Sequence, residues 1–281
     1  MGYLDRIEEC NTYDPSRYLP FWVGADRVGR VSKALAERLG AFADVFDVAP
    51  DRVALRPHLQ SFDRRTKAME GVLRALAAEG VVKGWRDEPY AVAAGPGAKP
   101  LMTMERAGVP LFGVRAYGVH LNGFVRQGDG HEMWVARRGR DKPTYPSALD
   151  NIAAGGIGYG IGVRDSLVRE AADEAGIPPA LAARAVPVGA ITYCCETDEG
   201  LRFDVIFAFD LELPADFVPQ NADGEVAAFD LWPIERVAQT VRETSEFKFN
   251  CNLVIIDFLV RFGLIAPEDA DYLDIVKGLH R

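Results

Sequence analysis

The chain has 281 residues, of which 48% are hydrophobic and 26% are charged, a balance that is ordinary for a globular protein. Its formal net charge of −9 argues against a nucleic-acid partner held on a basic surface. No apolar run approaches the roughly 18–20 residues of a membrane-spanning helix, and the N-terminus lacks the apolar region of a signal peptide. We therefore expect a cytoplasmic protein with no membrane partner and with reduced cysteines.

Two amphipathic helices are predicted early in the chain, at residues 27–42 and 66–80, because apolar residues recur there at helical spacing. Gly80 is suited to stop the second helix, since glycine tolerates the left-handed conformation common at that position. Residues 81–85 and 90–94 are predicted to be short strands. The first third of the chain is therefore expected to mix helices with strands.

Residues 93–110 are rich in glycine and proline and lack periodicity, which favours a linker. We therefore predict two domains, a smaller α+β domain at residues 1–110 and a second domain at residues 111–281. The first domain shows no catalytic motif. We expect it either to cover the active site or to form the interface of a homodimer.

The second domain is predicted to begin with strands, to continue with a helix and to return to strands. The strand-like runs are residues 117–125, 133–138, 187–195 and 202–213. Further helices are predicted at residues 232–243, 250–263 and 268–280. Strands on both sides of a central helix indicate a mixed α/β sheet with helices packed on it.

The central helix, predicted between the N-cap Asp165 and the stop Gly176, is acidic near its end. Glu170, Asp173 and Glu174 are neighbours on its surface. Like charges at this spacing cost roughly 0.2–0.5 kcal/mol. Anions near a helix C-terminus oppose its dipole by a further ~0.3–1 kcal/mol each. Arg169 can relieve part of this repulsion, and a divalent cation would relieve more. The alternative is a solvated acidic face.

The segment that starts at Gly155 resembles the Nudix box, G-x5-E-x7-R-E-U-x-E-E-x-G-U, in which U is an apolar residue. Residues 169–177 are in register with the end of this motif, and Asp173 replaces one of its glutamates. The isolated glutamate of the loop is absent, because Ile161 stands at that position, or Gly162 if the motif starts at Gly156 with one deletion. The match is long, so the segment is identified as a Nudix box that lacks one acid.

The resemblance extends over most of residues 105–281 and, more loosely, over the first hundred residues. The chain is similar to a Nudix subfamily that has an extra N-terminal domain and typically lacks the loop glutamate. This subfamily is related to the Nudix part of fungal thiamine pyrophosphokinase-fused proteins. The resemblance implies a Nudix α/β/α sandwich with a mixed sheet. It also implies hydrolysis of a small-molecule diphosphate with Mg²⁺, or alternatively Mn²⁺. The implied substrates are thiamine diphosphate and its oxidised forms, cleaved to the monophosphate and phosphate.

The resemblance also implies a set of metal ligands and catalytic acids. Glu170, Asp173 and Glu174 would hold the metal, together with a backbone carbonyl near Gly155. Glu170 and Glu174 both stay open as the catalytic base. A later loop offers a further catalytic acid, and the candidates are Glu225 and its rival Asp223. The alternative for that loop is a turn with solvated acids.

A basic cluster follows the strand predicted at residues 133–138. It consists of Arg137, Arg138, Arg140 and Lys142, and it suits a phosphate group because arginine can bind one through two parallel hydrogen bonds. The resemblance favours Arg138, Lys142 and Tyr145 as part of the site, whereas the alternative is ordinary surface charge. His120, in the first strand of the second domain, is either a substrate contact or a hydrogen-bonded core residue.

Three functions remain open from the sequence. The first is hydrolysis of thiamine diphosphates. The second keeps the same chemistry and acts on a nucleoside diphosphate derivative or a prenyl diphosphate. The third is a catalytically silent ligand-binding module, which the absent loop glutamate favours and the intact residues 169–174 oppose. Release of phosphate from a panel of diphosphates, with and without Mg²⁺, separates these functions.

Overall fold

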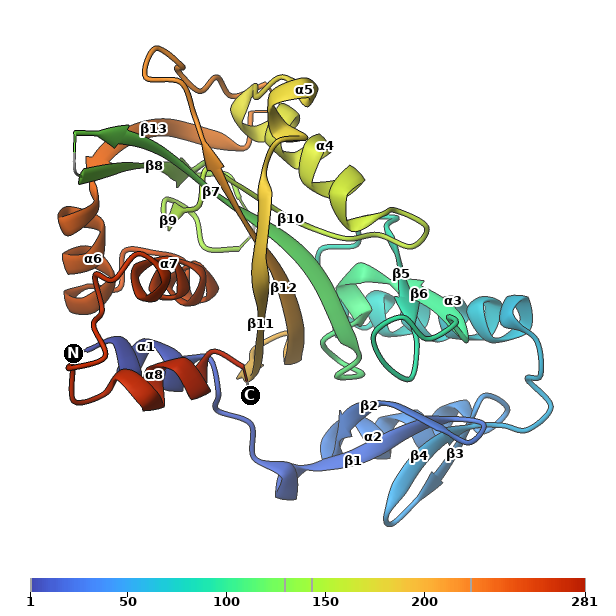
Figure 1. Ribbon diagram of the computed structural model, residues 1–281. Coiled ribbons are helices and arrows are strands. Elements are labelled where there is room, and N and C mark those ends of the chain that lie inside the picture. The colour runs from blue at the N-terminus through green and yellow to red at the C-terminus, as the bar shows by residue number, and fades with distance from the viewer. Residues whose placement is uncertain (1, 129, 143, 223, 281) are drawn as a thin grey trace.

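The computed structural model describes residues 2–128, 130–142, 144–222 and 224–280. Its strands form a four-stranded sheet, a two-stranded sheet and a seven-stranded sheet. The two smaller sheets lie in the N-terminal part of the chain and the large sheet lies in the C-terminal part (Figure 1). Both parts mix helices with strands, as the sequence predicts.

The N-terminal part is built on a sheet with the strand order β2-β1-β4-β3. Its core includes the rings of Phe21, Phe46 and Phe112, which contact one another. The helix α2 packs on the four-stranded sheet, and α3 packs on β6 of the two-stranded sheet. The elements are β1 (Tyr18–Val23), β2 (Asp26–Ser32), α2 (Lys33–Leu39), β3 (Phe46–Ala49), β4 (Arg52–Leu55), α3 (Phe62–Ala78), β5 (Pro89–Val92) and β6 (Met102–Glu105).

The helix predicted at residues 27–42 is confirmed only in its second half, and the prediction is wrong for its first half. The strand β2 runs up to Ser32, and α2 begins after it because the Ser32 hydroxyl accepts a hydrogen bond from the backbone N–H of Leu35 at 3.2 Å. The second predicted helix is confirmed as α3. Gly80 follows it with φ of +74°, the left-handed conformation expected of a helix stop.

Two predictions between residues 81 and 110 are wrong. Residues 81–85 form no strand, because the amides of Val81 and Val82 bond back to the carbonyl of Leu76 near the end of α3. Residues 93–110 do not form a loose linker, since they contain β6, whose residues are all buried. This strand pairs with β5, which confirms the strand predicted at residues 90–94.

The large sheet has the order β11-β12-β7-β8-β13, with β10 beside β7 and β9 beside β8. The strand β12 is parallel to β7, and the other pairs are antiparallel, so the sheet is mixed as predicted. Its strands are β7 (Arg115–Gln127), β8 (Gly130–Arg138), β9 (Leu149–Asp150), β10 (Ala153–Gly156), β11 (Val186–Thr197), β12 (Gly200–Glu212) and β13 (Val226–Pro233).

Helices cover both faces of the large sheet (Figure 1). Phe124 packs into the core under α7 and its neighbour Val125 into the core under α4, because successive strand residues point to opposite faces. This arrangement confirms the α/β/α sandwich. The helices are α1 (Tyr3–Glu9), α4 (Val163–Ala175), α5 (Pro179–Ala182), α6 (Ile234–Glu243), α7 (Phe249–Arg261) and α8 (Tyr272–Gly278).

The first helix, α1, packs on the C-terminal helices rather than on the N-terminal sheets. Ile7 and Cys10 are fully buried in the same core as α7 and α8. The Arg6 guanidinium donates a hydrogen bond to the carbonyl of Val241 in α6 at 3.0 Å. The two ends of the chain therefore share one core. Among the described residues, no helix has the length and apolar character needed to cross a membrane.

Candidate active site

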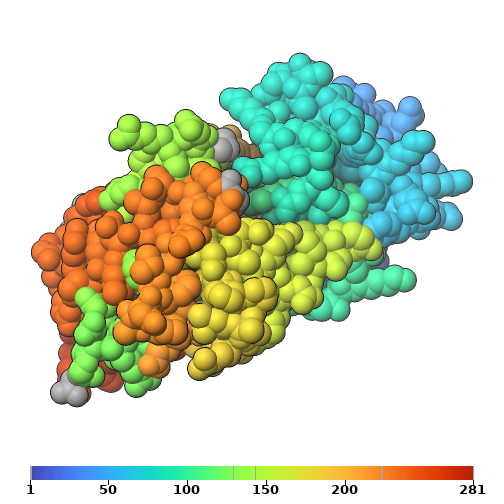
Figure 2. Space-filling view, turned by 90° about the horizontal axis from the view of Figure 1, so that it is seen from above, coloured from blue at the N-terminus to red at the C-terminus, as the bar shows by residue number. Residues whose placement is uncertain are grey.

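A cavity of about 860 Å³ lies between the N-terminal part and the large sheet. Figure 2 shows α4 (yellow) running beside the N-terminal part (teal). All but one of the predicted site residues line this cavity. Those that line it are His120, Arg138, Lys142, Tyr145, Gly155, Glu170, Asp173, Glu174 and Glu225. Residues that are far apart in the sequence are thus brought to one place.

The exception is Arg137, which is not among the described residues that line the cavity. It neighbours Arg138 on β8, and adjacent strand residues point to opposite faces. Its guanidinium donates a hydrogen bond to the carbonyl of Ser147 at 3.0 Å. Asp223, the predicted rival of Glu225, lies outside the described residues.

The acidic helix is α4, and it begins earlier than predicted. Its N-cap is Gly162 rather than Asp165, because the backbone N–H of Ser166 bonds to the Gly162 carbonyl at 2.9 Å. The helix ends as predicted at Gly176, which has φ of +63°. The strand β10 runs beside the helix and carries Gly155. The helix and this strand together form the acidic end of the cavity.

Glu174 is the most deeply buried acid of α4. Its carboxylate accepts a hydrogen bond from the backbone N–H of Ala154 at 2.8 Å. Burial raises the pKa of Glu174 to about 8, and the nearby carboxylate of Asp150 adds to this effect. The cluster around Glu174 is therefore short of positive charge, which a bound cation would supply.

The other two predicted metal ligands on α4, Glu170 and Asp173, differ in their surroundings. Glu170 is half-buried against the backbone of Gly155, and burial raises its pKa. Arg169 pairs with Glu170 at 2.6 Å. Asp173 is exposed at the edge of the cavity. In the part of the chain that is described, these acids are not gathered within 4.8 Å of one another.

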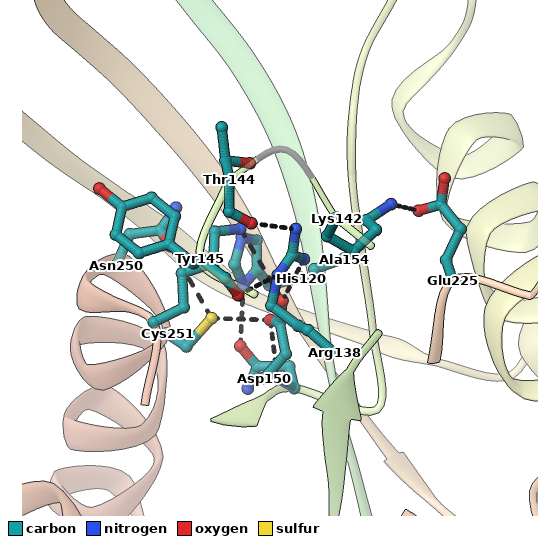
Figure 3. A network of polar contacts seen from close by, with 12 residues as sticks. His120, Arg138, Lys142, Thr144, Tyr145, Asp150, Ala154, Glu225, Asn250 and Cys251 are labelled. Atoms are coloured by element: carbon teal, nitrogen blue, oxygen red, sulfur yellow. Dashed lines mark hydrogen bonds and ion pairs between the residues drawn. The ribbon is translucent and has the colours of Figure 1, made fainter. Parts of the chain in front are cut away.

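Arg138 donates three hydrogen bonds to its own surroundings (Figure 3). Its guanidinium donates to the buried carboxylate of Asp150 at 2.9 Å. It also donates to the carbonyls of Thr144 and Tyr145, at 3.0 and 3.2 Å. All three of its nitrogens are therefore used to hold the loop that follows β8. The structure gives Arg138 a positioning role at this loop, although its side chain lines the cavity.

Lys142 and Glu225 both line the cavity and form an ion pair (Figure 3). The Lys142 side chain is 17% exposed, whereas that of Glu225 is 44% exposed. Tyr145 has φ of +50°, and its ring lies 5.3 Å from that of Phe249, measured between centroids. The loop after β8 thus brings a cation and an aromatic ring to the same cavity.

His120 is buried and lies at the end of a chain of hydrogen bonds. Its Nδ1 lies 2.8 Å from Oδ1 of Asn151, whose amide donates to Asn122 at 2.9 Å. Asn122 in turn donates to Asp210 at 2.9 Å, and Asp210 pairs with Arg261. A carboxylate can only accept, so the chain has one direction and places the proton of His120 on Nδ1. The structure confirms that His120 is a hydrogen-bonded core residue, and its role as a substrate contact stays a prediction for a side chain that lines the cavity.

A buried group formed by His120, Asp150 and Cys251 has its ligand atoms within 4.8 Å of one another. Cys251 donates its thiol hydrogen to Asp150 at 2.7 Å. The same carboxylate pairs with Arg138 and lies 3.9 Å from the Lys248 ammonium. Burial would raise the pKa of Asp150, yet Lys248 and these neighbours hold it below its usual value. The group is therefore already neutralised and does not suit a metal.

A polar wall of the cavity was not predicted from the sequence. Tyr193 on β11 donates to Asp204 on β12 at 2.6 Å, and Asn250 donates to the Tyr193 hydroxyl at 3.2 Å. All three residues line the cavity. No local pattern in the sequence links Asn250 to a tyrosine 57 positions away.

Comparison with known proteins identifies the family. A family model described as a domain of unknown function, DUF4743, matches residues 2–116. Nudix hydrolase 20, chloroplastic, from Arabidopsis thaliana is 41% identical to the chain over 289 residues, which cover 99% of this chain and 77% of that protein. The chain belongs to the Nudix hydrolases. Nudix hydrolase 24, chloroplastic, from the same plant is 40% identical over 282 residues, again covering 99% and 77%.

Among solved structures, the NUDIX domain of Shewanella oneidensis NrtR, complexed with ADP ribose, is 14% identical to the chain. The match has a TM-score of 0.43 and covers 53% of this chain and 90% of that domain.

Nudix hydrolases generally use a divalent metal ion. The acidic end of the cavity fits such an ion, because its donors are carboxylates and the carbonyl of Gly155, which are the oxygen ligands that Mg²⁺ prefers. Burial raises the pKa of both Glu170 and Glu174, and a divalent cation beside them would favour their charged forms. We therefore regard the acids of α4 and Gly155 as the residues that would hold the metal, rather than the neutralised group around Asp150.

Proposed function

We propose that this Nudix hydrolase cleaves thiamine diphosphate and its oxidised forms, with Mg²⁺ as its metal ion. The proposal rests on the subfamily resemblance of residues 105–281 and on one structural observation. A single cavity joins the acids of α4 to a polar and aromatic wall. A substrate with a diphosphate at one end and a heterocycle at the other matches these two surfaces.

The acidic end supports hydrolysis of a diphosphate. Glu174 and Glu170, with Asp173 and the Gly155 carbonyl, would hold the metal, which when bound neutralises diphosphate oxygens. Glu170 also suits the role of general base, because burial raises its pKa toward the range in which a carboxylate accepts a proton effectively. Glu225 lines the same cavity and is the alternative base. The attacking water would thus lose its proton to a carboxylate beside the metal.

The polar wall supports a heterocycle at the far end of the substrate. Asp204, Tyr193 and Asn250 offer hydrogen-bond acceptors and donors, and an aminopyrimidine presents groups of both kinds. The rings of Tyr145 and Phe249 add an apolar surface nearby. A prenyl chain has no donor or acceptor to offer these polar groups, so covering them with it would cost free energy. The wall therefore favours the thiamine proposal over a prenyl diphosphate.

A substrate panel tests the proposal. The kcat/KM of the purified protein is measured with Mg²⁺ for oxothiamine diphosphate, thiamine diphosphate, a nucleotide sugar and isopentenyl diphosphate. We expect the two thiamine compounds to exceed the others by tenfold or more, which corresponds to about 1.4 kcal/mol of transition-state discrimination. A nucleotide sugar or the isoprenoid in first place would contradict the thiamine proposal and leave the Nudix chemistry standing.

A second experiment tests the acids. Glu174→Gln keeps the size of the side chain but removes its charge, so we expect hydrolysis to fall by about a hundredfold or more. Circular dichroism should show an unchanged fold. An unaltered turnover number in this variant would remove Glu174 from the metal site.

A further inference from the structure

The N-terminal part of the chain forms one wall of the cavity and holds the loop that leads into α4. The backbone N–H of Tyr159 in this loop donates to the carbonyl of Pro89 at 2.8 Å. The Tyr90 hydroxyl sits against Gly156, where a Cβ would lie 1.7 Å from its oxygen. The ring of Tyr159 also lies 5.6 Å from that of Phe62, measured between centroids. The N-terminal part therefore contacts the loop that leads into α4 directly.

Arg106 follows β6 and reaches the same place. Its guanidinium carbon would lie 3.4 Å from a Cβ at Gly156, the neighbour of Gly155 in the chain, and lies over the ring of Tyr90 at 5.5 Å from the ring centroid. Arg106 and Glu170 line the same cavity, and the positive charge of Arg106 acts on the Glu170 carboxylate. A diphosphate bound through a metal ion on the acids of α4 would therefore lie near this guanidinium.

Three other cations near the acids have partners of their own. Arg138 bonds through all three of its nitrogens, Lys142 pairs with Glu225 and Arg169 pairs with Glu170. Arg138 is thus held by the loop that follows β8, and Arg169 is tied to one of the acids. The diphosphate is strongly anionic and the protein has a net charge of −9, so a further cation with free donors would strengthen substrate binding.

Arg106 has this capacity. It donates one nitrogen, Nη1, to Glu88 at 2.8 Å. Its Nε and Nη2 have no hydrogen-bond partner in the part of the chain that the structure describes. Its side chain is 36% exposed, which makes it accessible yet partly shielded from solvent. Four other cations line the cavity as well. Lys83 and Arg86 are exposed, so salt and water screen their charges more strongly, whereas Arg202 pairs with Glu199 and Lys248 lies 3.9 Å from the Asp150 carboxylate.

We propose that Arg106, supplied by the N-terminal part, binds the diphosphate group of the substrate through Nε and Nη2. The proposal rests on the proposed function in one respect, namely that the substrate is a diphosphate. It gives the N-terminal part a direct role in the active site. The planar fork of arginine suits two oxygens of one phosphate, and lysine reproduces the charge but not the fork.

Binding of methylenediphosphonate, a diphosphate analogue that resists hydrolysis, tests the proposal. Its Kd is measured by titration calorimetry with Mg²⁺ for the full chain. We expect Arg106→Gln to weaken binding at least fivefold, with a melting temperature close to that of the unaltered protein. Arg106→Lys should lie between the two. A loss smaller than fivefold in Arg106→Gln, or no binding by the unaltered protein, would overturn the proposal.

Two further variants separate binding from structure. Arg74 is a matched control, because it also pairs with a glutamate (Glu70) and lies over an aromatic ring (Trp85), but outside the cavity. We expect Arg74→Gln to bind the analogue as tightly as the unaltered protein. Glu88→Gln breaks the same ion pair from its other side and leaves the guanidinium in place, so binding should stay the same or tighten.

Equal weakening in Glu88→Gln and Arg106→Gln would mean that only the ion pair matters, and the proposal would be wrong. Glu88→Gln also decides the question if the Arg106 variants do not fold, since tighter or equal binding supports a free phosphate-binding guanidinium and weaker binding contradicts it. Hydrolysis is measured separately. An unaltered protein that binds the analogue but cleaves no diphosphate would refute the proposed function without affecting the result for Arg106.

Discussion

The carboxyl group of Glu170 occupies the space that a side chain at Gly155 would need. A Cβ on Gly155 would lie 2.1 Å from Cδ of Glu170, far inside the distance at which two carbon atoms can pack. Gly155 is not among the glycines with positive φ, so its backbone does not require glycine. The absence of its side chain instead lets the acid of α4 lie directly against β10.

Gly155→Ala should therefore displace the Glu170 carboxylate. We expect hydrolysis to fall at least tenfold, and the affinity for Mg²⁺ to fall with it. The free energy of unfolding should decrease by about 1–3 kcal/mol, the usual cost of overpacking. Kinetics and calorimetric titration with Mg²⁺ measure these effects. The control is Gly189→Ala on β11, where a Cβ meets nothing within 4 Å. Equal kinetics in both variants would show that the contact does not matter.

Substitution of Arg138 should lower the stability of the protein more than substitution of its neighbour Arg137. Arg138→Ala leaves the buried Asp150 without its closest cation and releases two loop carbonyls, so we expect a loss of about 3 kcal/mol in unfolding free energy. Arg137→Ala removes one hydrogen bond to the Ser147 carbonyl and should cost less than about 1 kcal/mol. Urea denaturation measures both values. Similar losses would contradict the positioning role of Arg138.

The acidic helix was predictable because its pattern is local. Residues 169–177 lie on one helix, so their spacing alone shows which acids are neighbours, and Gly176 marks the end. A mixed sheet with helices packed on it was predictable from the order of strand-like and helical runs, whereas the α/β/α sandwich was implied by the family resemblance. The start of α2 was mispredicted because the capping by Ser32 was not recognised and β2 has apolar residues at a spacing that also fits a helix.

The rest of the site depends on contacts between distant residues. The capacity of Arg138 was overestimated because Asp150 lies 12 positions away and its burial cannot be read from the sequence. Arg106 was missed because it lies in a stretch that was interpreted as a linker. The pairing of Tyr193 with Asp204 follows from the register of β11 with β12, which only the folded sheet defines. The acids of α4 were therefore predictable from the sequence, but the polar wall of the cavity was not.

Asn250 should affect the choice of substrate more than the chemistry. Asn250→Ala removes an amide from the polar wall, so we expect kcat/KM for thiamine diphosphate to fall about three- to tenfold, the value of one hydrogen bond. Hydrolysis of an alkyl diphosphate without a ring should stay within twofold. The control is Asn11→Ala, whose amide donates to the Ile7 carbonyl outside the cavity. An equal loss on both substrates would place Asn250 outside the recognition of the ring.

The acid stability of the protein should depend on His120. Burial, together with the positive charge of Lys248, lowers the pKa of His120 to about 4 from an ordinary value of 6.5. The unfolded chain therefore binds a proton on this residue at a higher pH than the folded protein does. Between pH 6.5 and 4 the unfolded state holds more protons, so stability must fall as the pH falls through this range.

We expect this group to cost about 3 kcal/mol of unfolding free energy between pH 6.5 and 4, because each tenfold change in proton affinity corresponds to about 1.4 kcal/mol. His120→Gln cannot take up the proton, yet its amide can still donate to Asn151. This variant should lose less stability over the same range, as measured by urea denaturation at several pH values. His58→Gln, at an exposed position, is the control and should follow the unaltered protein. Parallel curves for the unaltered protein and His120→Gln would show that His120 is not the group whose protonation destabilises the fold.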